Sequence, residues 1–323
     1  VSLAVGLLIE DGLIQSLDQP ISDFFPEWKT GEKNKITVRM LLNHTSGLDK
    51  RRASEMGDQR GIIVHALESP LVFSPGTDFS YNNNAVDFLA GVIEKASGER
   101  ADFYIDRRLF APMGITDTDW ARDVLGTPLT AGELMMRPID LAKIGQMALD
   151  EGVWDGRRII NQKWLEESVK TAQSFEADYG LLWRINDREG ERVVGVTPAL
   201  VERWVKAGVR PEIIELLRPL IGRPMKNLDE LGESLWTAYR DYPAYWEELN
   251  SKWRRGLPFR EIIQLGPVDG FYAVGYLGQY LVVDPKRRLV GVRMREANDN
   301  DWHDRPSVDV FWDFPQLVPR LVP

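Results

Sequence analysis

The sequence predicts an α+β fold, in which short helices fill the first half of the chain and strands follow later. Two observations carry this prediction. Before residue 177, apolar residues recur at helical spacing between glycines, prolines and capping side chains. After Tyr179 they gather in short runs typical of strands. A chain of 323 residues is long enough for one large domain or two modest ones.

The first two helices are defined by their ends. Residues 1–13 form an apolar run that predicts a mostly buried helix, and Gly12 is placed to terminate it. Thr37 is suited to cap a short helix over Val38–Asn43. The turn-forming pair Ser46-Gly47 ends that segment.

Three more helices are predicted in the first half. Asn83 or Asn84 begins a helix with one apolar face, and Gly98 closes it. Pro138 suits the first position of the next helix, because its missing N–H has no partner there. Asn161 can cap a further helix through its side-chain oxygen.

The second half changes character. Strands are predicted at Tyr179–Ile185, at Phe271–Val283 with a bend at its glycines, and at Leu289–Arg295. Residues 284–288, Asp-Pro-Lys-Arg-Arg, connect the last two strands as a tight hairpin. Ser307–Leu321 is predicted as a short C-terminal helix, which its prolines break.

A helical insertion at about 196–266 separates the first strand from the second. It carries four tryptophans, Trp204, Trp236, Trp246 and Trp253. One interpretation is a lid whose aromatic side chains hold an apolar acyl or oligomer chain. The other is that the aromatic residues form the insertion's own small core, and we favour it because four tryptophans bury much apolar area.

Composition excludes several classes of function. Lys and Arg number 40 against 49 Asp and Glu, and the formal net charge of −9 argues against a nucleic-acid partner. The absence of cysteine excludes disulfides, thiolate nucleophiles and Cys-based metal sites. The three histidines lie far apart, so we expect no metal site. The longest apolar run, Val1–Ile9, is too short to cross a membrane.

Structural roles are the simplest interpretation of the remaining polar candidates. His44 lies close to Ser46, but no Gly-x-Ser-x-Gly elbow surrounds that serine. His65 is expected within a helix, and Asp140 is expected to cap or pair near the start of its helix. His303 and the nearby carboxylates are interpreted as surface loop groups; these carboxylates are Asp299, Asp301 and Asp304.

Several short motifs occur in a fixed order along the chain. Tyr81 and Asn83 form a Tyr-x-Asn triplet, which alone is also explained by a tyrosine packed at a helix entrance beside a capping asparagine. The other motifs are Leu-Leu-Asn-His-Thr-Ser-Gly-Leu at 41–48, Phe-Ser-Pro-Gly-Thr at 73–77, Gly-Val-Ile-Glu at 91–94, Arg-Pro-Ile-Asp-Leu-Ala-Lys-Ile-Gly at 137–145 and Gly-Val-Trp-Asp-Gly at 152–156.

Together these motifs resemble the serine β-lactamase-related family, which includes class C β-lactamases, DD-peptidases, esterases and aminohexanoate-oligomer hydrolases. The resemblance covers nearly the whole chain except the insertion. It implies a single β-lactamase/DD-peptidase-like domain over 1–323. A mostly helical lobe would span 16–177, and an antiparallel sheet flanked by helices would take in 1–13 and 178–323. The active site would lie between these lobes.

The resemblance also implies acyl transfer through a serine ester, with no metal or organic cofactor. Tyr81 would relay a proton from the serine to the leaving group, and Asn83 would hydrogen-bond a catalytic lysine or the substrate carbonyl. A free tyrosine has a pKa of about 10, and a neighbouring ammonium would help to lower it toward neutrality.

The family's third motif, Lys-Thr-Gly or His-x-Gly on a strand that lines the site, corresponds to Ala273-Val274-Gly275. The backbone N–H of Tyr276 is then a candidate oxyanion donor. Ala273 occupies the position of the lysine or histidine, which argues against β-lactams and D-Ala-D-Ala peptides and favours esters or neutral amides. Alternatively, Gly275 and Gly278 only mark a bent strand.

The family's nucleophile motif, Ser-x-x-Lys, does not occur in the 323 residues. In the family this motif precedes a Glu-Asp-Gly-like turn, which corresponds here to residues 10–12. We therefore expect the motif just upstream of Val1, an N-terminally incomplete sequence, and no activity from residues 1–323 alone.

The leading hypothesis is a serine hydrolase of small carboxylic esters or amides that acts through an acyl-enzyme. One alternative is a β-lactamase or DD-peptidase. Another is a non-catalytic protein that binds a peptide or a cell-wall fragment in the same cleft. The sequence does not predict the oligomeric state or the compartment.

Overall fold

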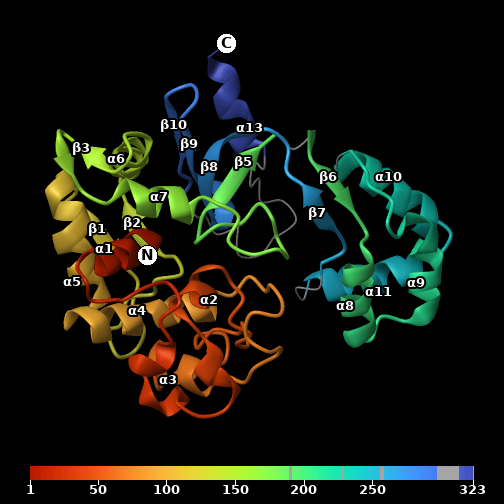
Figure 1. The fold of residues 1–323 in the computed structure, drawn as a ribbon, viewed down its shortest axis with the longest axis horizontal. Coiled ribbons are helices and arrows are strands. Elements are labelled where there is room, and N and C mark those ends of the chain that lie inside the picture. Colours follow the sequence, from red (N-terminus) through yellow and green to blue (C-terminus); the bar gives the residue numbers. More distant parts are fainter. Residues whose placement is uncertain (189–190, 227, 255–257, 297–312, 323) are drawn as a thin grey trace. The chain divides into compact units, whose positions relative to one another are not determined.

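The computed structural model describes residues 1–188, 191–226, 228–254, 258–296 and 313–322. These residues form two compact units. Unit 1 comprises 1–172, 179–185 and 270–323, and unit 2 comprises 173–178 and 186–269. Figure 1 shows the elements of each unit.

Unit 1 begins with the helices that carry most of its core. They are α1 (Ser2–Glu10), α2 (Val38–Leu42), α3 (Ile62–Glu68), α4 (Asn83–Ser97), α5 (Ala101–Ile105), α6 (Pro138–Leu149) and α7 (Gln162–Ser168). The predicted helices are present, with small shifts at their ends, and α3 contains His65, which was expected within a helix; α5 has no counterpart in the prediction. Two hairpins, β1 (Thr118–Trp120) with β2 (Leu134–Met136) and β3 (Val153–Trp154) with β4 (Arg157–Arg158), lie between helices in the chain.

Side-chain caps explain where these helices start. Thr37 accepts a hydrogen bond from the backbone N–H of Met40, and Asn161 accepts one from the N–H of Lys163. Such caps satisfy backbone donors that have no partner inside the helix. Gly98 ends α4 in the left-handed conformation, as predicted.

The main sheet has the strand order β10-β9-β8-β5 (Figure 1). Its strands are β5 (Arg184–Asp187), β8 (Val268–Gly275), β9 (Gln279–Asp284) and β10 (Leu289–Arg293). β9 pairs antiparallel with both β8 and β10. The predicted hairpin between β9 and β10 is confirmed, because Asp284 pairs with Leu289 in the register.

Two strand predictions were wrong in extent. Residues 179–183 form a turn, in which the Gly180 N–H donates to the Trp183 carbonyl at 2.8 Å, and the strand begins only at Arg184. The predicted strand Phe271–Val283 is two strands joined by a tight turn. Leu277 and Gly278 both have positive φ angles there, of 65° and 74°, and they reverse the chain.

Only part of the predicted C-terminal helix falls within the described residues. Residues 307–312 lie outside them. The rest contains a short helix, α13 (Phe314–Leu317), followed by a 3-10 turn at Val318–Leu321.

Helix α6 packs against β9 and β10 of the sheet. Gly145 allows this close approach, since a Cβ at that position would lie 2.6 Å from Cγ1 of Val290 and 2.7 Å from Cδ1 of Leu281. The helices and the sheet share one hydrophobic core, which includes Leu281, Ile144 and Phe88. The helices and the strands that are expected to form the candidate site are therefore held by the same close-packed core.

Unit 2 contains the insertion and has a core of its own. It comprises a two-stranded sheet, β6 (Val193–Gly195) with β7 (Glu261–Gln264), and the helices α8 (Pro198–Lys206), α9 (Pro211–Leu217), α10 (Leu228–Tyr239) and α11 (Pro243–Arg254). Trp204 is fully buried in this core, and its indole N–H donates to the Pro258 carbonyl at 2.7 Å. Trp236 and Trp246, by contrast, are 68% and 38% exposed. The favoured interpretation thus holds for Trp204 but not for these two side chains.

Hydrogen bonds join the two ends of the insertion. The Gly266 N–H donates to Oδ2 of Asp187 at 2.7 Å, and the Arg188 N–H donates to the Pro267 carbonyl at 3.1 Å. Arg192 forms a buried ion pair with Asp187. The chain therefore enters and leaves this part of unit 2 at neighbouring points.

Replacement of Gly47 by alanine is expected to lower the free energy of unfolding by about 2–3 kcal/mol. Gly47 has a φ of 76°, and an added Cβ would overlap the carbonyl oxygen of Phe73. Gly57→Ala is the matched control, because Gly57 has a φ of 64° with open space around it. Urea unfolding should show the larger loss for Gly47→Ala; equal losses would mean that the overlap is relieved without strain.

Candidate active site

A cavity of about 270 Å³ lies within unit 1. Tyr81 and Asn83 line it from the start of α4, and Ala273 lines it from β8. Most of the other lining side chains are apolar, and among the described lining residues Arg184 carries the only charged side chain. The structure therefore brings three of the predicted site residues to one cavity.

The chain around Tyr81 is held by buried polar groups. The side-chain oxygen of Asn82 accepts from the Ala85 N–H at 2.9 Å, which caps α4. The amide nitrogen of Asn82 donates to the Leu48 carbonyl at 2.7 Å. Asn82 is buried, whereas Tyr81 is 49% exposed and lines the cavity.

The phenol of Tyr81 stays protonated at neutral pH. Burial raises its pKa, while the guanidinium groups of Arg184 and Arg52 act in the opposite direction but do not outweigh it. A phenolate at this position would require a further positive charge close to the hydroxyl.

His44 lies behind Tyr81 and is fully buried. Its Nδ1 accepts from the Asn82 N–H at 3.2 Å, so the proton of the neutral ring is assigned to Nε2. Nε2 then donates to the hydroxyl of Tyr179 at 2.8 Å. Burial, assisted by the charge of Arg184, lowers the pKa of His44 to about 3.

The rings of His44, Tyr81 and Tyr179 form an aromatic cluster. The ring centroid of His44 lies 4.5 Å from that of Tyr81 and 5.0 Å from that of Tyr179. The two tyrosines meet edge to face at 6.4 Å, and the guanidinium of Arg184 lies 5.1 Å from the ring centroid of Tyr179. Sequence reasoning missed Tyr179, because its segment was interpreted as a strand and no motif contains it.

The segment predicted to supply the oxyanion donor ends β8. Ala273 pairs with Leu281, and Gly275 pairs with Gln279 at the last position before the turn. Tyr276 follows in that turn, is 59% exposed, and is absent from the described lining of the cavity, as is Gly275. The role of this segment as an oxyanion donor stays a prediction. Of the two glycines, Gly278 is the one that the turn requires, because it has a positive φ.

The side chain of His44 does not contact Ser46 through a hydrogen bond. Its ring nitrogens bond Asn82 and Tyr179, while Oγ of Ser46 accepts from the Leu48 N–H at 3.4 Å. Asp140 pairs with Arg137, the N-cap of its helix, and with Lys143 one turn further on, as predicted. His303 and the carboxylates near it lie outside the described residues.

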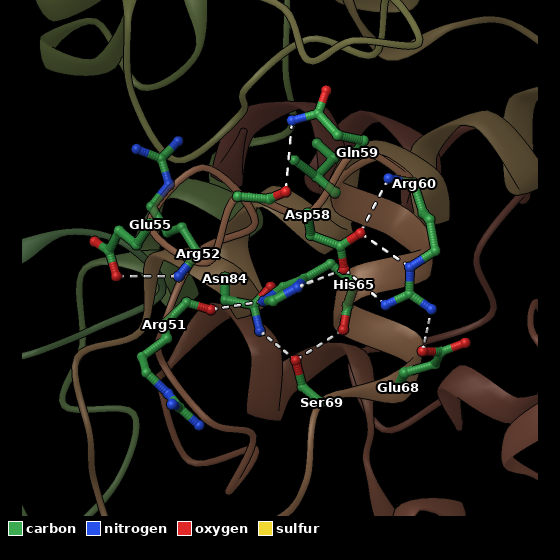
Figure 2. A network of polar contacts seen from close by, with 12 residues as sticks. Arg51, Arg52, Glu55, Asp58, Gln59, Arg60, His65, Glu68, Ser69 and Asn84 are labelled. Atoms are coloured by element: carbon green, nitrogen blue, oxygen red, sulfur yellow. Dashed lines mark hydrogen bonds and ion pairs between the residues drawn. The ribbon is translucent and has the colours of Figure 1, made fainter.

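A second polar network ties the loop before α3 to that helix (Figure 2). Nδ1 of His65 lies 3.1 Å from Oδ2 of Asp58, and Nε2 donates to the Arg51 carbonyl at 2.8 Å. Asn84 donates to Oγ of Ser69 at 2.9 Å, so the start of α4 joins the same network. Within the described ranges, no three His, Asp or Glu side chains come together as metal ligands would.

Acid is expected to destabilise the fold through His44. A buried histidine whose pKa falls from 6.5 to about 3 on folding binds fewer protons folded than unfolded. Its stabilising effect is complete above pH 6.5 and is lost as the pH falls toward 3. Urea unfolding should therefore show a smaller loss between pH 7.5 and 4.5 for His44→Asn than for the wild type. If the wild type and His44→Asn lose the same free energy of unfolding, His44 must already be protonated in the folded state at pH 4.5.

Comparison with known proteins places the chain in a family. A family model described as Beta-lactamase matches residues 1–308. The lovastatin esterase of Penicillium rubens is 29% identical, with 92% of this chain aligned to 76% of that protein. The 6-aminohexanoate-dimer hydrolase of Paenarthrobacter ureafaciens is 28% identical over 54% of this chain and 48% of its own length.

A solved structure supports the same fold. A proposed β-lactamase from Bacteroides dorei superposes with a TM-score of 0.51 at 21% identity, over 57% of this chain and 62% of the other. The predicted α+β, β-lactamase/DD-peptidase-like fold is thus confirmed. In the part of the chain that the structure describes, none of the helices combines the length and apolar character of a membrane span. With a family match over nearly its full length, this chain belongs to the β-lactamase family.

Proposed function

We propose that this chain forms the body of a serine hydrolase that cleaves small carboxylic esters or amides through an acyl-enzyme. One observation supports the proposal above the others. Tyr81 and Asn83, from the Tyr-x-Asn motif, face the same cavity as Ala273 on the strand that corresponds to the family's third motif. These residues are distant in sequence, and their convergence on one cavity is what an active site requires.

In the proposed reaction, a serine hydroxyl attacks the acyl carbon of the substrate. Tyr81 takes the serine proton and passes it to the oxygen or nitrogen of the leaving group, which departs as an alcohol or amine. Water then attacks the acyl-enzyme, releases the carboxylic acid and restores the serine. Because burial raises the pKa of Tyr81, the reaction needs a cation beside its phenol, the role that the resemblance gives to lysine.

The residues of the cavity favour neutral substrates. The position of the family's lysine or histidine is Ala273, and most of the lining is apolar. The names of two relatives, an esterase of lovastatin and a hydrolase of 6-aminohexanoate dimer, match the two proposed bond types. A β-lactamase or DD-peptidase is the runner-up, which the absence of a cation at residue 273 disfavours.

The nucleophile is not assigned to a residue of this sequence, because Ser-x-x-Lys does not occur in it. Residues 1–323 alone are therefore expected to be inactive, since loss of the nucleophile costs such enzymes on the order of a millionfold in rate. The decisive experiment labels the natural full-length protein with a fluorophosphonate and maps the adduct by digestion and mass spectrometry. A serine adduct supports the hydrolase. Folded protein without an adduct supports the non-catalytic binding protein instead.

Substrate charge separates the two hydrolase candidates. We expect the full-length protein to hydrolyse p-nitrophenyl butyrate, a neutral ester, with a higher kcat/KM than a chromogenic cephalosporin, which carries a carboxylate. The reverse preference would favour the β-lactamase alternative.

A further inference from the structure

His44 holds the chain on both sides of Tyr81. Its carbonyl oxygen accepts from the Ser80 N–H at 3.0 Å, and its Nδ1 accepts from the Asn82 N–H at 3.2 Å. Between these two hydrogen bonds, the imidazole ring lies against the ring of Tyr81 with 4.5 Å between centroids. One buried residue thus fixes the backbone before and after Tyr81 as well as its side chain.

The same ring reaches the second phenol of the cavity. Nε2 of His44 donates to the Tyr179 hydroxyl at 2.8 Å, and both Tyr81 and Tyr179 line the cavity. His44 is 1% exposed and is itself absent from the described lining. It cannot touch a substrate without rearrangement, so any effect on chemistry must pass through the two tyrosines.

We propose that His44 is a positioning residue, a neutral imidazole that fixes the phenols of Tyr81 and Tyr179 in the candidate active site. The proposal rests on the proposed function for the part that concerns catalysis. The arrangement of the ring itself is independent of that function.

The two ring hydrogen bonds require one protonation state. Nδ1 must keep its lone pair to accept from the Asn82 N–H, so a proton added there would break this bond. Among the described residues, the guanidinium of Arg184 acts on the ring, the hydroxyl of Tyr179 bonds it and the ring of Tyr81 packs against it, and none of them is an acid that would stabilise an imidazolium at neutral pH. Histidine is also one of the residue types that tolerate the left-handed backbone found here, with φ of 61°.

Phenylalanine at position 44 removes both ring nitrogens, and it also brings backbone strain at a φ of 61°, which the double-mutant cycle below carries in both backgrounds. His44→Phe retains a ring beside Tyr81 and the carbonyl that binds Ser80, but it loses the bonds to Asn82 and Tyr179. His65→Phe is the matched control. His65 also uses both ring nitrogens, toward Asp58 and the Arg51 carbonyl, but it belongs to the network of Figure 2 and not to the described lining of the cavity.

The first test does not require activity. In ¹⁵N NMR of residues 1–323, the signals lost in His44→Phe identify His44. We expect the pattern of a neutral ring protonated on Nε2 from pH 8 down to pH 5, and a shift of the Nε2 signal in Tyr179→Phe. Protonation of His44 above pH 5, or a proton on Nδ1, would overturn the arrangement.

The second test is a double-mutant cycle in the full-length protein, with p-nitrophenyl butyrate as substrate. We expect His44→Phe to lower kcat by about 10–100-fold with little change in KM, because small misplacement of a catalytic group has effects of this size. In a Tyr81→Phe background the same substitution should have almost no further effect on kcat. His65→Phe should leave kcat unchanged.

The two tests separate the possible failures. A kcat loss that is equally large in the Tyr81→Phe background would show that His44 only supports the fold, and would overturn the positioning role. If the wild-type protein forms no acyl-enzyme, the proposed function fails, while the NMR result still decides whether His44 holds the two tyrosines.

Discussion

Tyr81→Phe is expected to lower kcat/KM of the full-length protein for p-nitrophenyl butyrate by about 10²–10⁴-fold, the usual contribution of a general acid–base group. The substitution removes one oxygen and keeps the ring that packs against His44. Because Tyr81 is half exposed, folding should change little. Steady-state kinetics, with thermal unfolding measured in parallel, checks both statements.

Tyr242→Phe provides the matched control for the loss of a phenol. Tyr242 is 48% exposed and belongs to unit 2, where it stacks on Tyr245. Its hydroxyl has no place in the proposed reaction, so kcat/KM should stay within twofold of the wild type. A Tyr81→Phe enzyme that matches this control would remove Tyr81 from the proton relay.

Trp204→Ala is expected to destabilise unit 2 by about 3–5 kcal/mol, the range for loss of a large buried aromatic side chain. Trp204 is completely buried among Leu200, Ile213 and Leu217. The substitution also leaves the Pro258 carbonyl without its indole donor. Urea unfolding, followed by hydrogen exchange at amides of unit 2, would measure this loss.

Trp236→Ala serves as the control, since the Trp236 side chain is 68% exposed. Its effect on the free energy of unfolding should stay within about 0.5 kcal/mol. Comparable losses for both variants would mean that Trp236 also contributes to the core of unit 2. In that case the interpretation of the insertion as a unit with a four-tryptophan core would regain support.

Local signals predicted the helices of unit 1 well. Thr37 and Asn161 act as caps, Gly98 ends its helix in the left-handed conformation, and Pro138 occupies a first helical position. Each of these residues determines a boundary by short-range chemistry, so no tertiary information was needed.

Strand boundaries could not be predicted in the same way. An apolar run such as Phe271–Val283 has the same pattern whether it is one bent strand or two paired strands. The chain reverses direction at Leu277, which adopts a positive φ that a leucine side chain does not favour. Gly278 is therefore the only residue of this turn whose type indicates a positive φ. Tyr179 was likewise placed in a strand, although its segment turns before Arg184.

The candidate site shows the same division. Motifs identified Tyr81, Asn83 and Ala273, and all three line the cavity. The contact of His44 with Tyr81 and Tyr179 joins segments far apart in the chain. Neither residue type nor spacing indicates which of the three histidines packs behind Tyr81. This contact could therefore be identified only from the three-dimensional structure.

The hydrogen bonds that join the ends of the insertion have a consequence for the order of folding. β5 and β8 are neighbours in the sheet, yet about eighty residues of chain separate them. Closure of a loop of that length from an unfolded chain is entropically costly and slows folding. If unit 2 folds first, the hydrogen bonds from the Gly266 N–H to Asp187 and from the Arg188 N–H to the Pro267 carbonyl shorten the effective loop to a few residues. The insertion would then act as an intramolecular clamp that speeds nucleation of the main sheet.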